Sequence, residues 1–250
     1  MNRAVHPAAR AAVARGFERI RSGPYQLCLN AETAPHAGAI AIALRELGAA
    51  ASGGAGNRAG GFRVALPAGP QLFVRRARRG GAMRLLLDDL YLGLRPRPFA
   101  ELAVAAEAMR RGVPLAEPMG AAVRWAAPAL YRGFFISRAL SGMTLWEFVR
   151  TDDDPGVRGH VLERAREAIE QMLQAGLYHP DLNLHNLFVT RRGESFSVII
   201  LDLDKARLGD QPLGERARRQ VAARLARSAH KLDPRGRFID AAAMSILKPA

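Results

Sequence analysis

The sequence has 250 residues, of which 49% are hydrophobic, and its formal net charge at pH 7 is +14. This length and apolar content argue against disorder as the main state and suit one two-lobed unit or two small domains. The single cysteine, Cys28, excludes an intramolecular disulfide and a cysteine-rich metal site, and suits a reducing compartment. The basic charge favours a polyanionic partner: nucleic acid, an anionic membrane surface or a phosphorylated substrate.

The pattern of apolar residues disfavours a membrane-spanning or secreted protein. The best apolar run, over residues 38–44, is too short for a bilayer and is followed by Arg45 and Glu46. The N-terminus has scattered arginines but lacks a compact apolar segment with a small-residue cleavage site, so it does not resemble a secretory signal. We therefore expect a cytoplasmic protein.

Residues 1–52 show only a weak pattern of apolar residues. A short strand is predicted at residues 25–29, and apolar residues recur at helical spacing over 40–47. Nothing catalytic is visible in this stretch, so it is treated as a separate N-terminal region without an assigned role.

A glycine-dense stretch follows, and it precedes two predicted strands at residues 62–66 and 71–75. A dinucleotide-binding fingerprint would require a helix directly after the glycines, whereas a strand follows here. Kinases cover ATP phosphates with a glycine-rich turn between strands, because residues without a Cβ let backbone N–H groups come close. A flexible surface linker is the alternative. Three glycines are predicted to contact ATP: Gly56, Gly60 and Gly61.

Arg75 ends the second strand, where kinases carry the lysine that holds the α- and β-phosphates. Arginine is able to bind phosphate through two parallel hydrogen bonds, and Arg76 is the alternative residue for this task. A helix is predicted from Phe99 to Gly112, and Glu101 near its start is the expected ion-pair partner of Arg75. A glutamate that is simply solvated is the competing interpretation.

The middle of the chain carries the signals of a hinge and of a supporting helix. A buried strand over residues 131–140 leads to Gly142, and we expect adenine to bind backbone groups near residues 138–140. Thr144 and Glu147 have the spacing of a capping box. Apolar residues at helical spacing over 161–173 then predict a buried helix in front of the next segment.

Residues 179–186 read His-Pro-Asp-Leu-Asn-Leu-His-Asn, which is the H-x-D-L-x-x-x-N pattern of a kinase catalytic loop. A predicted hairpin follows and ends at Asp202, which brings Asn186 and Asp202 together at its open end. In phosphoryl transfer these residues have separate tasks. Asp181 orients the acceptor hydroxyl and takes its proton, while Asn186 and Asp202 hold Mg²⁺ against the phosphates of ATP.

Two further residues of the loop are candidate catalytic residues. His179 is expected to brace the loop structurally. Asn183 stands where protein kinases often have a lysine and is expected to touch the transferring phosphate or the acceptor. A zinc site at His179 and His185 is an alternative, but the spacing gives no compact ligand set. Nucleic acid is not expected as a partner, because the basic residues 75–79 lack the interleaved aromatic residues that stack on bases.

The catalytic-loop sequence, the segment Ile-Leu-Asp-Leu-Asp-Lys at 200–205 and the later stretch 225–232 resemble the lipopolysaccharide core kinases. Among these they are most similar to the kinases of 3-deoxy-D-manno-octulosonic acid (Kdo). The likeness covers roughly residues 54–232. It implies an α+β, bilobal protein-kinase-like fold, with a small β-rich N-lobe with one main helix over 53–141 and a mainly helical C-lobe over 142–250.

The resemblance also implies an activity. The protein would use ATP and Mg²⁺ to transfer phosphate to a hydroxyl of Kdo on lipid A, or on a related anionic glycolipid. The reaction would take place at the cytoplasmic face of the inner membrane of a Gram-negative bacterium. Heptose kinases of the lipopolysaccharide core and aminoglycoside- or choline-type kinases are the competing activities. A catalytically silent kinase-like binding protein is the alternative of another class.

A basic amphipathic helix is predicted near the C-terminus. Its apolar residues include Val221 and Leu225, and its opposite side carries arginines such as Arg216 and Arg219. Two placements stay open: the helix lies on an anionic membrane as part of a peripheral association, or its apolar stripe packs on the C-lobe.

Overall fold

The computed structural model describes residues 14–50, 61–76 and 90–249. The chain divides into two compact units. The first comprises residues 1–107 and 117–139, and the second comprises residues 108–116 and 140–250.

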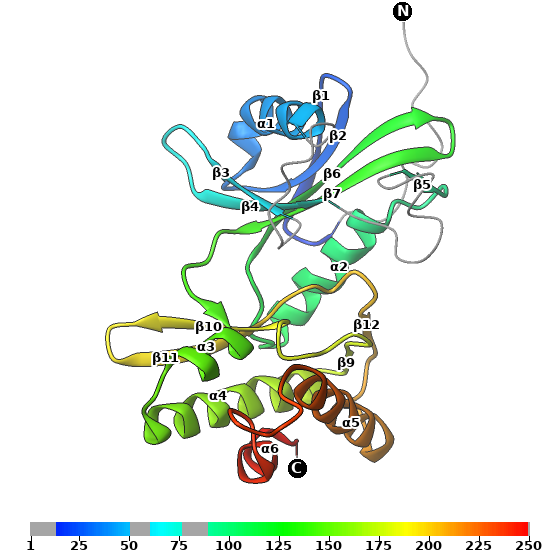
Figure 1. Cartoon of the computed structure of the whole chain (residues 1–250). Coiled ribbons are helices and arrows are strands. Elements are labelled where there is room, and N and C mark those ends of the chain that lie inside the picture. Colours follow the sequence, from blue (N-terminus) through cyan, green and yellow to red (C-terminus); the bar gives the residue numbers. More distant parts are fainter. Residues whose placement is uncertain (1–13, 51–60, 77–89, 250) are drawn as a thin grey trace, which may run out of the picture. The chain divides into compact units, whose positions relative to one another are not determined.

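An antiparallel sheet forms the first unit (Figure 1). Within the described residues it has seven strands, in the order β1-β2-β6-β7-β4-β3, and β5 adds to the free end of β7. The strands are β1 (Phe17–Ser22), β2 (Tyr25–Asn30), β3 (Gly61–Ala65), β4 (Gln71–Arg76), β5 (Tyr91–Leu92), β6 (Pro118–Ala127) and β7 (Leu130–Arg138).

Helices cover both faces of this sheet (Figure 1). On one face, Ile40 and Leu44 of α1 (Ala37–Ala50) pack in a core with Leu72 and Val74 of β4. On the other face, Leu102 of α2 (Arg97–Arg110) packs against β2 and β6. A strand places alternate side chains on opposite faces, so β4 contributes to both layers. A short 3-10 turn, η2 (Ala34–His36), connects β2 to α1.

The segment from β1 to α1 belongs to the same folding unit as the predicted N-lobe strands. β2 pairs with β6, with Leu27 opposite Ala122 and Leu29 opposite Gly120. The prediction that residues 1–52 are separate from an N-lobe with one main helix is therefore corrected. The structure adds α1 and two strands to that lobe, because β2 and α1 supply much of the core on that face.

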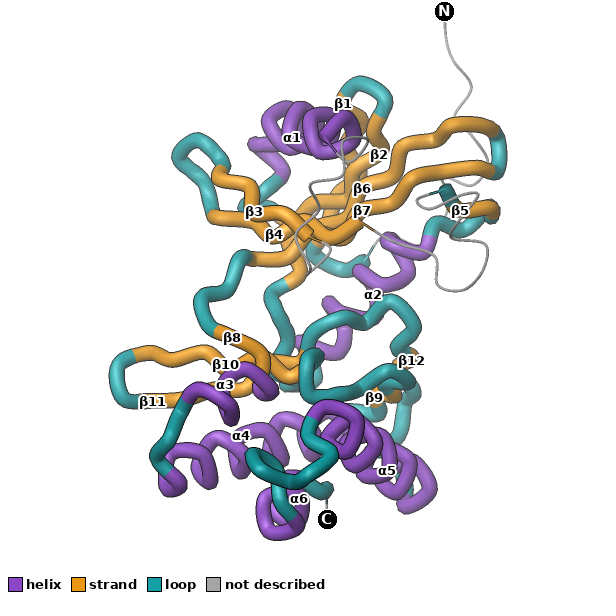
Figure 2. Tube along the Cα trace, viewed as in Figure 1, coloured by secondary structure: helices purple, strands orange, loops and turns teal. Residues whose placement is uncertain are grey.

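The second unit is mainly helical, as Figure 2 shows. Its central helix α4 buries seven apolar residues between Val161 and Leu173, as the helical spacing predicts. The antiparallel β10–β11 hairpin packs on α4, and β8 pairs with β10. The elements are β8 (Met143–Thr144), α3 (Leu145–Thr151), α4 (Pro155–Gln174), β9 (Leu177–Tyr178), β10 (Leu187–Arg192), β11 (Ser195–Ile200), β12 (Arg207–Leu208), α5 (Glu215–Leu232) and α6 (Ala241–Leu247).

Capping interactions fix the ends of several elements in this unit. The predicted capping box is present: Thr144 Oγ accepts from Glu147 N, and the Glu147 carboxylate accepts from Thr144 N. The pKa of Glu147 is lowered by the hydrogen bonds from the Thr144 backbone and hydroxyl. Asp233, which ends α5, accepts backbone N–H groups of residues 237–239 at 2.7–2.9 Å. Burial alone would raise the pKa of Asp233, but these donors lower it below its ordinary value.

The basic helix α5 packs its apolar stripe into the second unit. Val221, Leu225 and Ala229 are buried. Of the two placements that the sequence left open, the structure therefore shows the one in which the apolar stripe packs on the C-lobe. Two of its arginines bind within the unit: Arg218 pairs with Glu170 at 2.7 Å, and Arg224 contacts Tyr178. The exposed basic residues of this helix are Arg216, Arg219, Arg227 and Lys231.

Candidate active site

Of the three predicted ATP-binding glycines, the structure describes Gly61. Gly56 and Gly60 fall outside the described residues. Gly61 opens β3 and pairs with Arg75 of β4. A Cβ at position 61 would lie 2.3 Å from the ring of Phe73, so a larger residue here would require that ring to move. This close approach to Phe73 is separate from the predicted contact of Gly61 with ATP.

The structure contains the predicted ion pair between Arg75 and Glu101. The Arg75 side chain is 20% exposed and the Glu101 side chain is 3% exposed. The Arg75 guanidinium also lies 5.9 Å from the centre of the Phe135 ring on the neighbouring strand. The pair therefore fixes an arginine on the α2 side of the sheet, with its cation partly open to solvent.

Arg76, the alternative phosphate-binding residue, is buried and donates to the Leu47 carbonyl oxygen of α1 at 2.9 Å. Since neighbouring strand residues point to opposite faces, Arg76 lies on the α1 side. Of the two arginines, Arg75 is thus the one on the α2 side, beside Glu101.

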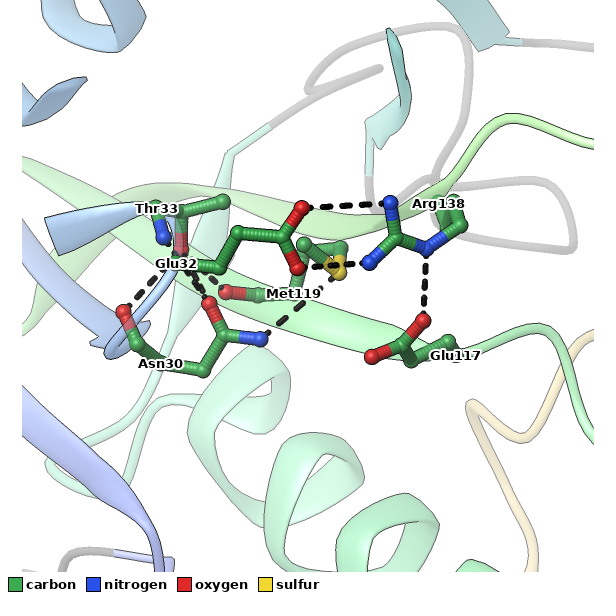
Figure 3. Close-up of polar contacts among 6 residues, drawn as sticks. All are labelled: Asn30, Glu32, Thr33, Glu117, Met119 and Arg138. Carbon is green, nitrogen blue, oxygen red and sulfur yellow. Dashed lines mark hydrogen bonds and ion pairs between the residues drawn. The ribbon is translucent and has the colours of Figure 1, made fainter. Parts of the chain in front are cut away.

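A charged network holds the end of β7, as Figure 3 shows. Arg138 donates to Glu32 at 2.6 and 3.2 Å and to Glu117 at 2.6 Å. These two carboxylates raise the pKa of Arg138, so its positive charge is fixed. Beside them, the buried Thr33 hydroxyl lies 2.8 Å from the Met119 carbonyl oxygen. Local sequence patterns do not reveal this network, because its members are far apart in the sequence.

Two backbone N–H groups of residues 138–140, where adenine is expected to bind, are hydrogen-bonded within the protein. The backbone N–H of Arg138 donates to Glu117 O at 2.9 Å, and that of Ala139 donates to Gln71 O at 2.8 Å. Both N–H groups are therefore used within the first unit. Adenine binding near residues 138–140 stays a prediction, and it would use backbone groups other than these two N–H groups.

His179 braces the catalytic loop. It is 1% exposed, its Nδ1 accepts from Asp181 N at 3.3 Å, and its Nε2 lies 3.0 Å from Leu201 O. Burial lowers the pKa of His179, although the bond to Leu201 and the charges of Asp202 and Asp181 act in the opposite direction. The ring is therefore neutral, with Nε2 as donor and Nδ1 as acceptor. With both nitrogens engaged by the chain, the zinc alternative loses its first ligand.

Asn183 and Asn186 both bind the backbone of Asp181. Asn183 Nδ2 donates to Asp181 O at 2.8 Å, and its Oδ1 accepts from His185 N at 2.9 Å. Asn183 therefore uses both polar atoms to shape the loop, which differs from the predicted contact with phosphate or acceptor. Asn186 Nδ2 donates to the same Asp181 oxygen at 2.9 Å. This bond orients the Asn186 amide through its nitrogen, so Oδ1 is the side-chain atom with the chemistry to bind a cation.

Asp202 lies two residues after Ile200, the last residue of β11, and has a backbone φ of +61°. A non-glycine residue in this left-handed region is uncommon, although aspartate is tolerated there better than most, and such strain gathers at functional sites. Leu201 N donates to Asn186 O at 2.9 Å, which places the start of β10 beside the end of β11. The hairpin thus brings Asn186 next to Asp202, as the sequence predicts.

The Asp181 carboxylate faces a lysine that the sequence analysis left without a role. Lys205 Nζ lies 3.1 Å from Asp181 Oδ2, and both side chains are 61% exposed. Only the place of Lys205 in the Asp-Leu-Asp-Lys segment, three residues after Asp202, could have pointed to it.

Helix α5 supports the loop from the other side. Ser228 Oγ accepts from Leu184 N at 3.3 Å. Arg224 donates to the Tyr178 hydroxyl and lies 5.1 Å from the centre of its ring, and that hydroxyl also lies 3.3 Å from Gln220 Oε1. The loop is therefore positioned by a rigid helix, which favours a precise site.

The oxygen ligands present suit Mg²⁺. Within the described residues, no group of three or more His, Cys, Asp or Glu side chains is placed to hold a metal ion. Mg²⁺ in nucleotide sites is bound by one or two protein carboxylates, with substrate phosphates and water completing its shell. The Asp202 carboxylate and the Asn186 amide oxygen, at the open end of one hairpin, fit that chemistry.

Residues 50–243, more than half of the chain, match the lipopolysaccharide kinase (Kdo/WaaP) family. The chain belongs to this family. Two of its relatives bear the name 3-deoxy-D-manno-octulosonic acid kinase. That of Xanthomonas campestris pv. campestris (strain B100) is 33% identical over 183 residues, which are 71% of this chain and 68% of the relative. That of Xylella fastidiosa (strain 9a5c) is 30% identical over 143 residues, 54% of this chain and 53% of the relative. The match thus spans about half the length of the Xylella protein.

Two solved structures are also similar to this chain. WaaP in complex with acyl carrier protein is 18% identical, with a TM-score of 0.48 and 76% of each chain covered. The Cydia pomonella granulovirus kinase PK-1 is 13% identical, with a TM-score of 0.37 over 56% of this chain and 44% of the kinase.

Membership of this kinase family, together with the observed elements, confirms the α+β kinase-like fold class predicted from the sequence. In the described part of the chain, no helix combines the length and apolar character needed to cross a membrane.

Proposed function

We propose that this member of the lipopolysaccharide kinase family transfers the γ-phosphoryl group of ATP to a hydroxyl of Kdo in the lipid A-linked inner core. The observation that carries this proposal is the loop geometry of the second unit. Asp181 is exposed while its backbone oxygen is held by Asn183 and Asn186, and Asp202 stands beside Asn186 in a strained backbone conformation.

The residues divide the reaction as follows. Asp181 accepts the proton of the acceptor hydroxyl as the new O–P bond forms and the bond from phosphorus to the β,γ-bridging oxygen of ATP breaks. Asn186 and Asp202 would hold Mg²⁺, which would neutralise phosphate charge when bound. Arg75, oriented by Glu101, binds the α- and β-phosphates in the place of the usual lysine. His179 and Asn183 keep the loop in shape without contacting the reacting atoms.

Several observations support an anionic glycolipid as acceptor. Both relatives described above carry the name of a Kdo kinase. The net charge of +14 suits an acceptor that bears a carboxylate and phosphates. The same charge favours peripheral association with an anionic leaflet on the cytoplasmic side. Because α5 buries its apolar stripe, this association would use the exposed arginines and Lys231 of α5, with no apolar insertion of that helix.

A panel of acceptors tests the assignment. Purified protein is incubated with Mg·ATP and one of three acceptors: Kdo-lipid A, heptosylated core lipid A, or lipid A that lacks Kdo. The product masses are measured by mass spectrometry. The proposal expects one added phosphate on Kdo-lipid A and none on lipid A alone. Transfer to the heptosylated acceptor only would replace Kdo by heptose as the substrate, and no transfer to any of the three would refute the proposed reaction.

A further inference from the structure

The catalytic loop itself carries no lysine or arginine for the phosphoryl group in transfer. Its residues 180–186 are Pro-Asp-Leu-Asn-Leu-His-Asn, and the position where a lysine is often found is Asn183. Both polar atoms of the Asn183 side chain bind the loop backbone. Asn183 is neutral and already engaged, so the charge that develops on the phosphoryl oxygens needs another partner.

Lys205 lies at the required place. Its ammonium group is 3.1 Å from Oδ2 of Asp181, the carboxylate that is proposed to receive the acceptor proton. Ala206 N donates to Leu203 O at 2.9 Å, and this turn carries Lys205 back from Asp202 toward the loop. The accepting oxygen must lie within hydrogen-bond reach of Asp181 and then bonds to phosphorus. A four-carbon side chain that reaches Asp181 therefore also reaches the oxygens of that phosphoryl group.

Stability does not explain this contact. An ion pair between side chains that are both 61% exposed contributes little to folding, because water screens the charges and both side chains lose rotamer freedom. The residue type is also informative. Only three of the 37 basic residues are lysines, at positions 205, 231 and 248.

Arginine is the commoner basic residue in this chain, and its guanidinium binds carboxylates through two parallel hydrogen bonds. If Asp181 were the only partner, an arginine would therefore bind it as well as a lysine or better. A lysine instead offers a compact point charge on a flexible stem, able to move between two anionic partners.

We propose that Lys205 is a catalytic residue whose ammonium group leaves Asp181 to stabilise the phosphoryl oxygens during transfer. This inference rests on the proposed kinase reaction. Lys205 transfers no proton in this step: the acceptor proton goes to Asp181, the O–P bond to the acceptor forms, the bond from phosphorus to the leaving oxygen breaks, and ADP departs with the electron pair of that bond.

The test compares Lys205→Met with Lys248→Met, which removes another exposed lysine near the C-terminus. The expected result for Lys205→Met is a loss of kcat of about 100-fold or more, the size seen when one preorganised charge-stabilising donor is removed. The KM for ATP, the affinity for a non-hydrolysable ATP analogue and the melting temperature are expected to stay at wild-type values. Lys205→Arg, which keeps the charge, is expected to recover part of the lost kcat, and Lys248→Met should match the wild type.

Two results would overturn the inference. If Lys205→Met retains kcat within threefold of an active wild type, the contact with Asp181 is a solvated ion pair without a catalytic role. If its loss of activity comes with a lower melting temperature or weaker nucleotide binding, Lys205 is structural. A wild-type protein without activity on any acceptor would instead refute the kinase reaction itself, so the two failures are distinguishable.

Discussion

Replacing Arg75 with methionine separates the structural role of the Arg75–Glu101 ion pair from its proposed role in binding phosphate. Methionine keeps an apolar stem near Phe135 but removes the cation beside a carboxylate whose side chain is 3% exposed. Removal of one partner from a buried ion pair costs about 3–5 kcal/mol, and the 20% exposure of Arg75 favours the lower end. At roughly 2–4 °C per kcal/mol for a chain of this size, we expect the melting temperature to fall by about 6–12 °C.

The double variant Arg75→Met/Glu101→Leu is the matched control. An apolar pair of similar volume restores stability to within about 1 kcal/mol of the wild type, because no charge is left in the buried position. Nucleotide affinity stays low, since the charge-assisted contact to phosphate, about 1.5–3 kcal/mol or roughly 10–150-fold in Kd, is absent. Urea unfolding gives the stability, and calorimetric titration with a non-hydrolysable Mg·ATP analogue gives the affinity. Wild-type affinity in the double variant would refute the phosphate-binding role of Arg75.

Three further substitutions probe the supports of the second unit. Asp233→Asn removes a carboxylate whose pKa is lowered in the folded protein, so its stabilisation is present at neutral pH and is lost as the pH falls through the folded pKa. Urea unfolding should show a free energy of unfolding about 1–3 kcal/mol below that of the wild type at pH 7, and a smaller difference at acid pH. An equal difference at both pH values would contradict this. Thr144→Ala breaks the capping box and should cost about 1 kcal/mol in urea unfolding, with no loss speaking against the cap. Arg224→Met loosens the contact of α5 with Tyr178 and should lower kcat roughly tenfold with unchanged Kd for nucleotide; steady-state kinetics that match the wild type would refute this support.

Local patterns were enough to predict much of the candidate site. The hairpin that joins Asn186 to Asp202 follows from two short apolar runs around a polar turn, and the buried supporting helix follows from spacing alone. The Arg75–Glu101 ion pair was predictable because arginines at a strand end precede a helix that carries a glutamate near its start.

Features that depend on distant partners were not predictable in the same way. The pairing of β2 with β6 joins residues about a hundred positions apart, and no periodicity in residues 1–52 reveals it. The Arg138 network has the same origin. Lys205 escaped notice because a turn brings it to Asp181, whereas Asn183 was assigned from its position without knowledge that its side chain binds the loop backbone.

The most direct test of the central claim compares the wild type with Asp181→Asn in one assay. Asparagine preserves the shape of the side chain but is unable to accept the acceptor proton. With Kdo-lipid A and Mg·ATP, the wild type should add the mass of one phosphate, and Asp181→Asn should lower kcat by about 100-fold or more, within the range of general-base contributions, while it binds the nucleotide analogue as the wild type does. Equal rates of phosphate transfer by the two proteins, or no transfer by the wild type, would contradict the assignment of this loop as the catalytic site of a lipopolysaccharide kinase.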